Sequence, residues 1–205
     1  MVPILWFLGK AMAHYALSPS AGPDYPRAKP LDSPVFMEGE VVKGFGRGSK
    51  VLGIPTANLP QHSLHQLPGD FSTGIYFGWA TVNGQGPYAM VTSVGWNPYF
   101  SNKVKTVEPH LLHEFPEDFY GAQIRLVITG YLRDELNFDS LDALIAAIQA
   151  DIQMTKKCLQ EDYHLKHRDN PYLQTKASVP LIGVVAAVGL FASVGIVLYM
   201  RTRGR

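Results

Sequence analysis

The chain has 205 residues, of which 46% are apolar and 17% charged, so it can form one globular domain with extensions and is not disordered throughout. Four of its 18 basic residues and none of its 17 acidic residues lie in residues 171–205, which leaves the rest of the chain with a net charge of −3. A body with that charge has no electrostatic footprint for nucleic acid, and none is expected as a partner. The single cysteine, Cys158, excludes an internal disulfide and a cysteine-based zinc site.

The first 34 residues are expected to be a flexible extension. A short apolar run, residues 2–8, precedes a stretch with prolines at positions 19, 23, 26, 30 and 34. A signal peptide would begin with positive charge, whereas Lys10 follows the apolar run. A mitochondrial presequence would be rich in arginine, whereas Arg27 is the first arginine. Both targeting alternatives stay open.

A first strand is predicted at residues 36–42, and the glycine-rich segment GFGRGSK follows it at residues 44–50. Glycines let backbone N–H groups approach phosphate oxygens closely, and Arg47 and Lys50 add positive charge. The spacing is neither that of a Walker A loop nor that of a dinucleotide-binding turn. The segment therefore predicts an anion-binding loop, with a plain hairpin turn as the alternative.

The continuation GIPTAN, residues 53–58, carries a hydroxyl and an amide two residues apart. In an extended segment Thr56 and Asn58 point the same way. Thr56 is a plausible ligand for Mg²⁺, a hard cation that prefers oxygen, and Asn58 can bind phosphate or the same ion. The alternative is that both side chains hydrogen-bond their own turn.

Three further strands are predicted at residues 74–82, 88–96 and 124–132, which are rich in Val, Ile, Tyr, Phe and Thr and are separated by turn residues. No helical pattern lies between the early strands, so parallel βαβ winding is disfavoured. An antiparallel barrel or sandwich is expected.

The segment EPHLLH, residues 108–113, combines a carboxylate with two imidazoles. In an extended strand Glu108 and His110 share one face while His113 takes the other, so the three groups cannot all hold one metal ion. Glu108 suits a general base, which accepts a hydroxyl proton during phosphoryl transfer. Its structural alternative is an ordinary charge at a strand edge.

One helix is predicted after the strands. Asp139 or Ser140 can cap it, and apolar residues recur at helical spacing at positions 141, 144, 145, 148 and 152. This stripe is expected to pack against the strands.

The 24 residues from Ala177 to Met200 carry no charge and would be about 36 Å long as a helix, against a hydrocarbon core of about 30 Å. Arg201, Arg203 and Arg205 follow them. The segment predicts a single transmembrane helix at residues 177–200, with a buried core helix as the alternative.

Several of these motifs, in this order, resemble riboflavin kinase, the enzyme that makes FMN. The resemblance runs from about residue 36 to about residue 165. It rests on residues 44–50, 53–58, 74–76, 93–99, 108, 118–121, 130–133 and 137–141. It implies a mainly β fold, a six-stranded antiparallel Greek-key barrel with a C-terminal α-helix, to which the predicted transmembrane helix is added. The expected domains are an extension (1–34), the kinase barrel (35–165), a linker (166–176), the span (177–200) and a basic tail (201–205).

The resemblance also implies site residues. Glu108 would be the catalytic carboxylate, and Thr56 and Asn58 would bind Mg²⁺ and phosphate. Gly44 and Lys50 would belong to the ATP loop, and Leu111, His113 and Tyr120 would line the nucleotide site. Arg133, Leu136 and Phe138 would hold the flavin. The segment 134–136, Asp-Glu-Leu, departs from relatives that have Pro after the Arg, which puts flavin affinity or product release in doubt.

The expected activity is therefore ATP:riboflavin 5′-phosphotransfer, with ATP as co-substrate and Mg²⁺ as the metal, Zn²⁺ and Mn²⁺ being alternatives. Only a short extension precedes the kinase region, so a eukaryotic-type monofunctional enzyme is implied. The alternative functions are a catalytically silent membrane-tethered flavin or nucleotide sensor, and an anchor that recruits a partner through the barrel.

A monomeric barrel is expected. Basic charges on the two sides of residues 177–200 balance, and the need for MgATP favours a tail anchor with the barrel in the cytosol, at the mitochondrial outer membrane rather than the endoplasmic reticulum.

Overall fold

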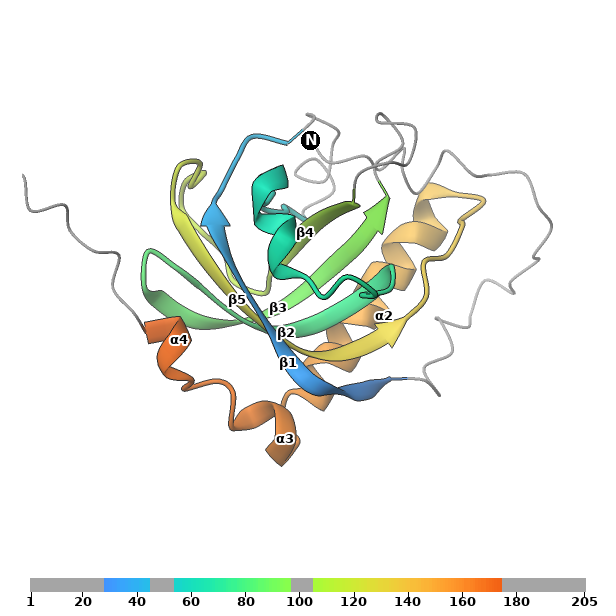
Figure 1. Cartoon of the computed structure of the whole chain (residues 1–205). Helices are drawn as coiled ribbons and strands as arrows, with labels where there is room; N and C mark the ends of the chain where they lie inside the picture. Colours follow the sequence, from blue (N-terminus) through green and yellow to red (C-terminus); the bar gives the residue numbers. More distant parts are fainter. Residues whose placement is uncertain (1–27, 45–53, 97–104, 175–205) are drawn as a thin grey trace, which may run out of the picture. The chain divides into compact units, whose positions relative to one another are not determined.

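The fold is built on one antiparallel β-sheet. The computed structural model describes residues 28–44, 54–96 and 105–174, and within these ranges five strands lie in the order β1-β5-β2-β3-β4 (Figure 1). Their bounds are Lys29–Glu40 for β1, Gly74–Val82 for β2, Gln85–Trp96 for β3, Lys105–Leu111 for β4 and Gln123–Arg133 for β5. Every neighbouring pair is antiparallel, so the predicted mainly β, antiparallel class is confirmed.

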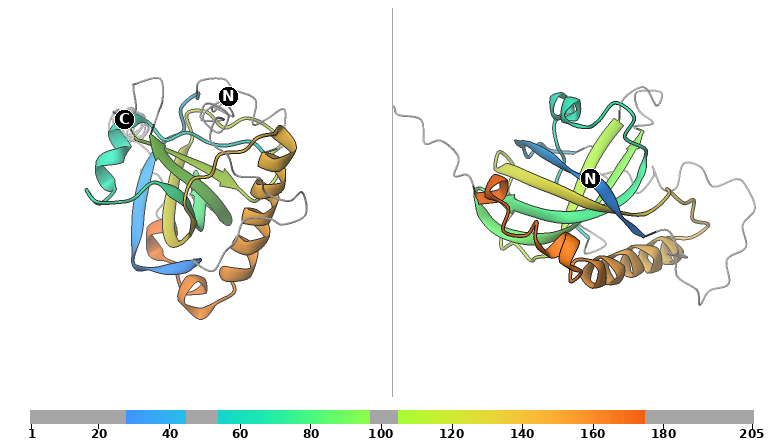
Figure 2. Two further views of the ribbon diagram at one scale, coloured as in Figure 1. Left: turned by 90° about the vertical axis from the view of Figure 1, so that its right-hand side faces the viewer. Right: turned by 60° about the horizontal axis from the view of Figure 1, so that its bottom comes forward.

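Helices cover both faces of this sheet. They are the 3₁₀-helix η1 (Gln61–Gln66) and the α-helices α2 (Leu141–Cys158), α3 (Asp162–Leu165) and α4 (Pro171–Gln174). In Figure 2 the long helix α2 runs along one face of the curved sheet, with α3 and α4 on the same side and η1 on the opposite side.

The central strand β2 shows how the two faces are filled. All nine of its residues are buried, and successive side chains point to opposite faces. Tyr76 joins a core that includes Leu64 of η1, whereas Phe77 joins a second core that includes Ile152 of α2. The sheet therefore separates an inner core from an outer core under the helices.

Glycines allow close approach within these layers. A Cβ atom at Gly130 would lie 2.1 Å from Cζ of Phe77, so the phenyl ring can occupy its place only because Gly130 has no side chain. A Cβ atom at Gly78 would lie 2.0 Å from the carbonyl oxygen of Val127, where the β2–β5 register shifts. Larger residues at either position would push apart groups that are now in contact.

Helix α2 begins as the sequence predicts. Ser140 is the N-cap, and its hydroxyl accepts a hydrogen bond of 3.1 Å from the N–H of Ala143. The predicted C-terminal helix is therefore confirmed. The residues of α2 that are buried against the sheet are Leu144, Ala147, Asp151, Ile152, Thr155 and Cys158.

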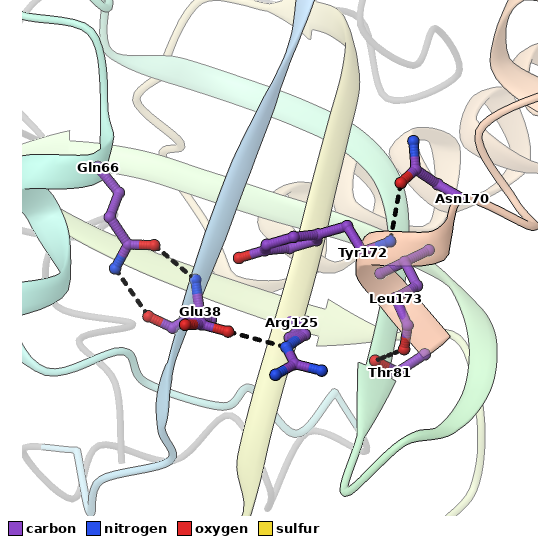
Figure 3. Close-up of polar contacts among 7 residues, drawn as sticks. All are labelled: Glu38, Gln66, Thr81, Arg125, Asn170, Tyr172 and Leu173. Carbon is purple, nitrogen blue, oxygen red and sulfur yellow. Dashed lines mark hydrogen bonds and ion pairs between the residues drawn. The ribbon is translucent and has the colours of Figure 1, made fainter. Parts of the chain in front are cut away.

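The outer edge of β1 is closed by a side chain. The amide of Gln66 accepts from the N–H of Glu38 at 2.8 Å and donates to its carbonyl oxygen at 2.9 Å, as a neighbouring strand would (Figure 3). The unpaired backbone groups of an edge strand can pair with another chain, and Gln66 occupies those of Glu38. The side chain of Glu38 accepts from Nε of Arg125 on β5 at 2.8 Å.

The predicted six-stranded barrel is corrected to a five-stranded sheet that is not a closed barrel. Residues 57–59 lie between the end of β1 and β4, where a sixth strand would stand, but form few ladder bonds. Ala57 donates to the carbonyl oxygen of Pro109 at 2.8 Å, and Leu59 donates to that of Val107 at 3.3 Å. Pro109 has no N–H with which to return a bond to Ala57, so this pair keeps only one of its two possible hydrogen bonds.

The segment that contains α3 and α4 packs on the sheet, although the sequence predicts a linker at residues 166–176. Nε1 of Trp79 donates to the carbonyl oxygen of His164 at 2.9 Å. The hydroxyl of Thr81 donates to the carbonyl oxygen of Leu173 at 3.0 Å (Figure 3). Leu173 is fully buried in the outer core. Helix α4 therefore belongs to the fold, and the other end differs as well, because β1 begins at Lys29.

No helix in the described ranges 28–44, 54–96 and 105–174 is long and apolar enough to cross a membrane. The predicted span at residues 177–200 and the basic tail at 201–205 lie outside these ranges. The added membrane helix is therefore not supported. The proposed domain boundaries remain a prediction.

Candidate active site

Asn58 lies opposite Glu108 on one face of the sheet. The hydrogen bonds from Ala57 to Pro109 and from Leu59 to Val107 fix an antiparallel register in which residue 58 faces residue 108. Ala57, Leu59 and Val107 all point into the inner core. Asn58 and Glu108 must then point to the other face, as a pair not joined by backbone hydrogen bonds, whose side chains are especially close.

The same face carries further polar groups in line with this pair. Ser93 of β3 is the register partner of Glu108, Ile75 of β2 is the partner of Ser93, and Arg133 of β5 is the partner of Ile75. Ile75 belongs to the outer core with residues of α2. A row from Asn58 to Arg133 thus crosses the sheet on the side that α2 covers, and Glu108 and Ser93 stand within it.

Glu108 is a buried carboxyl group, with 7% of its surface exposed. Burial raises its pKa to about 7, and a hydrogen bond from the side chain of Thr106 lowers the pKa in part. Desolvation disfavours the charged form of a carboxylate. A carboxyl group with a pKa near neutrality can exchange a proton at physiological pH, as a general base must.

Gly44 lies against Asn58. A Cβ atom at Gly44 would be 2.6 Å from Nδ2 of Asn58, so the backbone at this position touches the amide. The N–H of Val42 donates to the carbonyl oxygen of Asn58 at 3.0 Å. The start of the glycine-rich segment and the GIPTAN segment therefore meet beside Glu108. Lys50 lies outside the described residues.

Thr56 stands opposite His110 in the same register. Its hydroxyl oxygen is buried and has no hydrogen-bond partner among the described residues. The Thr56 hydroxyl, the Asn58 amide and the Glu108 carboxylate all offer oxygen atoms, which are the ligands that Mg²⁺ prefers. These residues fit a divalent cation held with a nucleotide. No group of three or more His, Cys, Asp or Glu side chains within the described ranges is placed to bind a metal ion.

His110 is half-buried, and its Nδ1 donates to the carbonyl oxygen of Pro55 at 2.7 Å. Burial lowers the pKa of this imidazole, and the hydrogen bond to Pro55 raises it in part. The ring therefore tends to be neutral while it ties the GIPTAN segment to β4.

The three residues predicted to line the nucleotide site have different settings. His113 is exposed and stacks on Tyr88, with ring centroids 4.4 Å apart, and Phe115 packs edge-on against both. Tyr120 is 54% exposed. Leu111, in contrast, is buried in the inner core, so its side chain faces away from Glu108.

The residues predicted to hold the flavin are gathered at α2. Nε and Nη2 of Arg133 donate to the two carboxylate oxygens of Asp151 at 2.8 and 2.6 Å, and both side chains are buried. The guanidinium lies 6.0 Å from the ring centroid of Phe138. Phe138 packs with Leu136 and residues of α2. The charge of Arg133 is thus balanced inside the protein.

Asp151, Ser93 and His110 are site features that the sequence reading did not assign. Asp151 had a signal, because it is an acid on a helix face whose other buried residues are uncharged. Alternation along an extended strand already puts His110 on the face of Glu108, whereas Ser93 had no signal, because only the strand register shows that it shares this face.

Comparisons with known proteins point to one family. The Flavokinase family, described as riboflavin kinase, matches residues 31–159. Riboflavin kinase of Homo sapiens is 53% identical over 145 residues, covering 71% of this chain and 94% of the human protein. That of Mus musculus is 55% identical over 141 residues, covering 69% and 91%. The crystal structure of riboflavin kinase from Trypanosoma brucei has a TM-score of 0.58 at 33% identity, covering 72% and 94%.

These matches define an enzyme of the kinase class. The chain belongs to the riboflavin kinase family.

The predicted membrane localisation is wrong. The family match ends at residue 159, the human and mouse relatives are covered over 94% and 91% of their lengths, and the described ranges hold no helix able to cross a membrane. The prediction relied on the length and hydropathy of residues 177–200, which indicate that a segment can enter a bilayer and not that it does. The tail anchor, the bilayer partner and the choice of the mitochondrial outer membrane over the endoplasmic reticulum are therefore corrected.

Proposed function

We propose that this chain transfers the terminal phosphoryl group of ATP to the 5′-hydroxyl of riboflavin, giving FMN and ADP, with Glu108 as the base. The observation that carries the proposal is the placement of Asn58 opposite Glu108, with Gly44 in contact with the same amide. The backbone that would bind phosphate, an amide and the carboxyl group that would accept the proton therefore lie near one another, which supports the proposal.

In this mechanism Glu108 accepts the hydroxyl proton as the bond from the ribityl oxygen to phosphorus forms and the bond from phosphorus to the ADP oxygen breaks. Its raised pKa suits this exchange, because a base with a pKa near the working pH is partly ionised and still attracts a proton strongly. Burial also keeps bulk water away from the carboxylate.

The nucleotide would be held by Gly44, Lys50, Thr56 and Asn58, with Leu111, His113 and Tyr120 around it. Support comes from the contact of Gly44 with Asn58 and from the unpartnered hydroxyl of Thr56. Thr56 and Asn58 would hold Mg²⁺, with Zn²⁺ or Mn²⁺ as alternatives, and the ion would supply positive charge to the phosphates. The stacked pair Tyr88 and His113 offers an aromatic surface that suits a base ring.

The flavin would lie toward α2, beside Leu136 and Phe138. Arg133 is proposed to act there through its buried pair with Asp151, which holds β5 to α2 and keeps the guanidinium beside the Phe138 ring. An apolar wall next to a fixed cation suits a flat heteroaromatic ring with polar edges.

The test is FMN formation by the purified full chain with riboflavin, ATP and Mg²⁺. FMN and ADP should appear in equal amounts, and omission of either ATP or the divalent ion should abolish both. A chain that binds riboflavin tightly and produces no FMN under these conditions would instead act as a flavin sensor, and the proposal would fail.

A further inference from the structure

We infer that His110 is a positioning residue for the nucleotide side of the site, because its Nδ1–H group holds the carbonyl oxygen of Pro55 and so fixes the face that Thr56 and Asn58 present to Glu108. This inference rests on the proposed function, since it assigns Thr56 and Asn58 to the MgATP site.

The segment that His110 holds has few backbone ties of its own. Among the described residues, its backbone hydrogen bonds to residue 42 and to β4 involve only Ala57, Asn58 and Leu59. Pro55 and Pro60, which flank these residues, have no N–H to donate. The buried side chain of Ile54 anchors the segment by packing, and packing alone does not fix the rotation of the following peptides.

The Pro55–His110 hydrogen bond supplies the missing tie at the position where it matters. It lies one residue before Thr56 in the segment and on the residue that faces Thr56 in the register. Glu108 is two residues from His110 on the same face of β4, so one short stretch of strand carries both the proton acceptor and the group that aligns its neighbours. Without the tie, Ala57 would still be bonded to β4, and the peptide before Thr56 would be free to rotate.

The chemistry of this tie is defined. A carbonyl oxygen only accepts, so Nδ1 must carry the hydrogen, and both the neutral ring and the imidazolium can donate from Nδ1. The alternative is that His110 acts through Nε2 by touching substrate. The two roles make opposite predictions for amide substitutes, because the Asn amide nitrogen reaches the place of Nδ1 and the Gln amide nitrogen reaches the place of Nε2.

The experiment compares His110→Asn, His110→Gln and His110→Leu in the full chain. We expect His110→Asn to keep the KM for MgATP within about 3-fold of wild type, and His110→Gln and His110→Leu to raise it by about 10-fold, as loss of one hydrogen bond would. The KM for riboflavin should stay unchanged in all three variants, because the tie lies on the nucleotide side.

A second readout does not depend on turnover. Amide hydrogen exchange of Ala57 and Leu59 in the nucleotide-free protein should be faster in His110→Leu and His110→Gln than in wild type, and near wild type in His110→Asn. Should His110→Leu fail to fold, His110→Gln carries the same comparison.

The inference is overturned if Asn and Leu behave alike in both measurements, or if Gln restores function and Asn does not. The two proposals fail separately. A wild-type chain that forms no FMN contradicts the proposed function, whereas the exchange rates of Ala57 and Leu59 still decide whether His110 fixes the segment.

Discussion

At the scale of single residues, the site depends on a carboxyl group kept in an unfavourable setting. Glu108 is buried, and the hydrogen bond from Thr106 compensates for only part of the lost solvation. A protein tolerates such a group only where the surrounding fold is stable enough to hold it, and shifted carboxylates gather at functional sites for this reason. Glu108 should then matter in opposite ways for activity and for stability.

For activity, Glu108→Gln keeps the size and hydrogen bonding of the side chain but cannot take a proton. We expect kcat to fall by about 10²- to 10⁴-fold, with a smaller change in riboflavin affinity. Steady-state FMN formation measures this, and Glu117→Gln, the same chemical change at an exposed position, serves as the control. Full turnover by a folded Glu108→Gln variant would remove Glu108 from the role of base.

For stability, the raised pKa of Glu108 fixes the sign of a pH effect. Between its ordinary value of 4.5 and its folded value of about 7, the folded protein keeps a proton that the unfolded chain has lost, so stability falls as pH rises through this range. Glu108→Gln removes that penalty. The comparison uses metal-free and nucleotide-free protein. The unfolding free energy of Glu108→Gln minus that of wild type should be larger at pH 8 than at pH 5 by about 2 to 3 kcal/mol. Urea denaturation at the two pH values measures it, and an unchanged gain would contradict the burial of a neutral carboxyl.

At the scale of elements, the closest approach in the site is between Gly44 and the side chain of Asn58. In Gly44→Ala the new methyl group would meet the Asn58 amide at 2.6 Å, and that amide is the movable end of a side chain. We expect the amide to shift, with unfolding free energy changed by less than about 1 kcal/mol and the KM for MgATP raised about 10-fold.

Gly69→Ala is the matched control for this prediction, because a Cβ atom at Gly69 meets nothing within 4 Å. Kinetics and thermal unfolding of both variants provide the comparison. Equal KM values for MgATP in Gly44→Ala and Gly69→Ala would show that the position of the Asn58 amide does not matter for the nucleotide.

Four of the five strands in the described residues, and the long helix, were predicted from the sequence by residue type and hydrophobic pattern, whereas β4 was not among the predicted strands. The strand predicted at 74–82 coincides with β2, and the predicted caps place the start of α2 correctly. The five-stranded form of the sheet was not accessible. It depends on Pro109, whose missing N–H interrupts a ladder with residues more than forty positions earlier in the chain, and no local pattern reveals which strand faces a proline.

The candidate site was also only partly predictable from the sequence. Glu108, Thr56 and Asn58 were identified as candidates by residue type and by resemblance, whereas their common face follows only from the register between residues 57–59 and β4. Asp151 shows the intermediate case. Its place on the buried stripe of α2 marks it as unusual, yet the sequence does not show that its partner is Arg133 of β5.

At the scale of the whole molecule, the short helices α3 and α4 complete the outer core. They have no helical periodicity to predict them, and they are attached to the sheet through contacts with β1, β2 and β5. Thr81 bonds to the carbonyl oxygen of Leu173 (Figure 3). Trp79 bonds to the carbonyl oxygen of His164, and the ring of His164 bonds to Thr129 of β5 at 2.9 Å. The row from Asn58 to Arg133 and this covering segment therefore share one sheet, at different places on it.

Leu173→Ala tests that arrangement. Leu173 is fully buried in the outer core, so removal of its branched end should lower the unfolding free energy by about 2 to 5 kcal/mol. Leu165→Ala, at a side chain 39% exposed, should cost less than about 1 kcal/mol and is the matched control. Because Leu173 packs beside Thr81 rather than beside Glu108, kcat at a temperature where both variants are folded should stay within about 2-fold of wild type. Chemical denaturation and FMN formation measure the two quantities. A Leu173→Ala variant as stable as Leu165→Ala would mean that residues 166–174 behave as the linker that the sequence suggests, whereas the expected loss makes α4 a part of the folded domain.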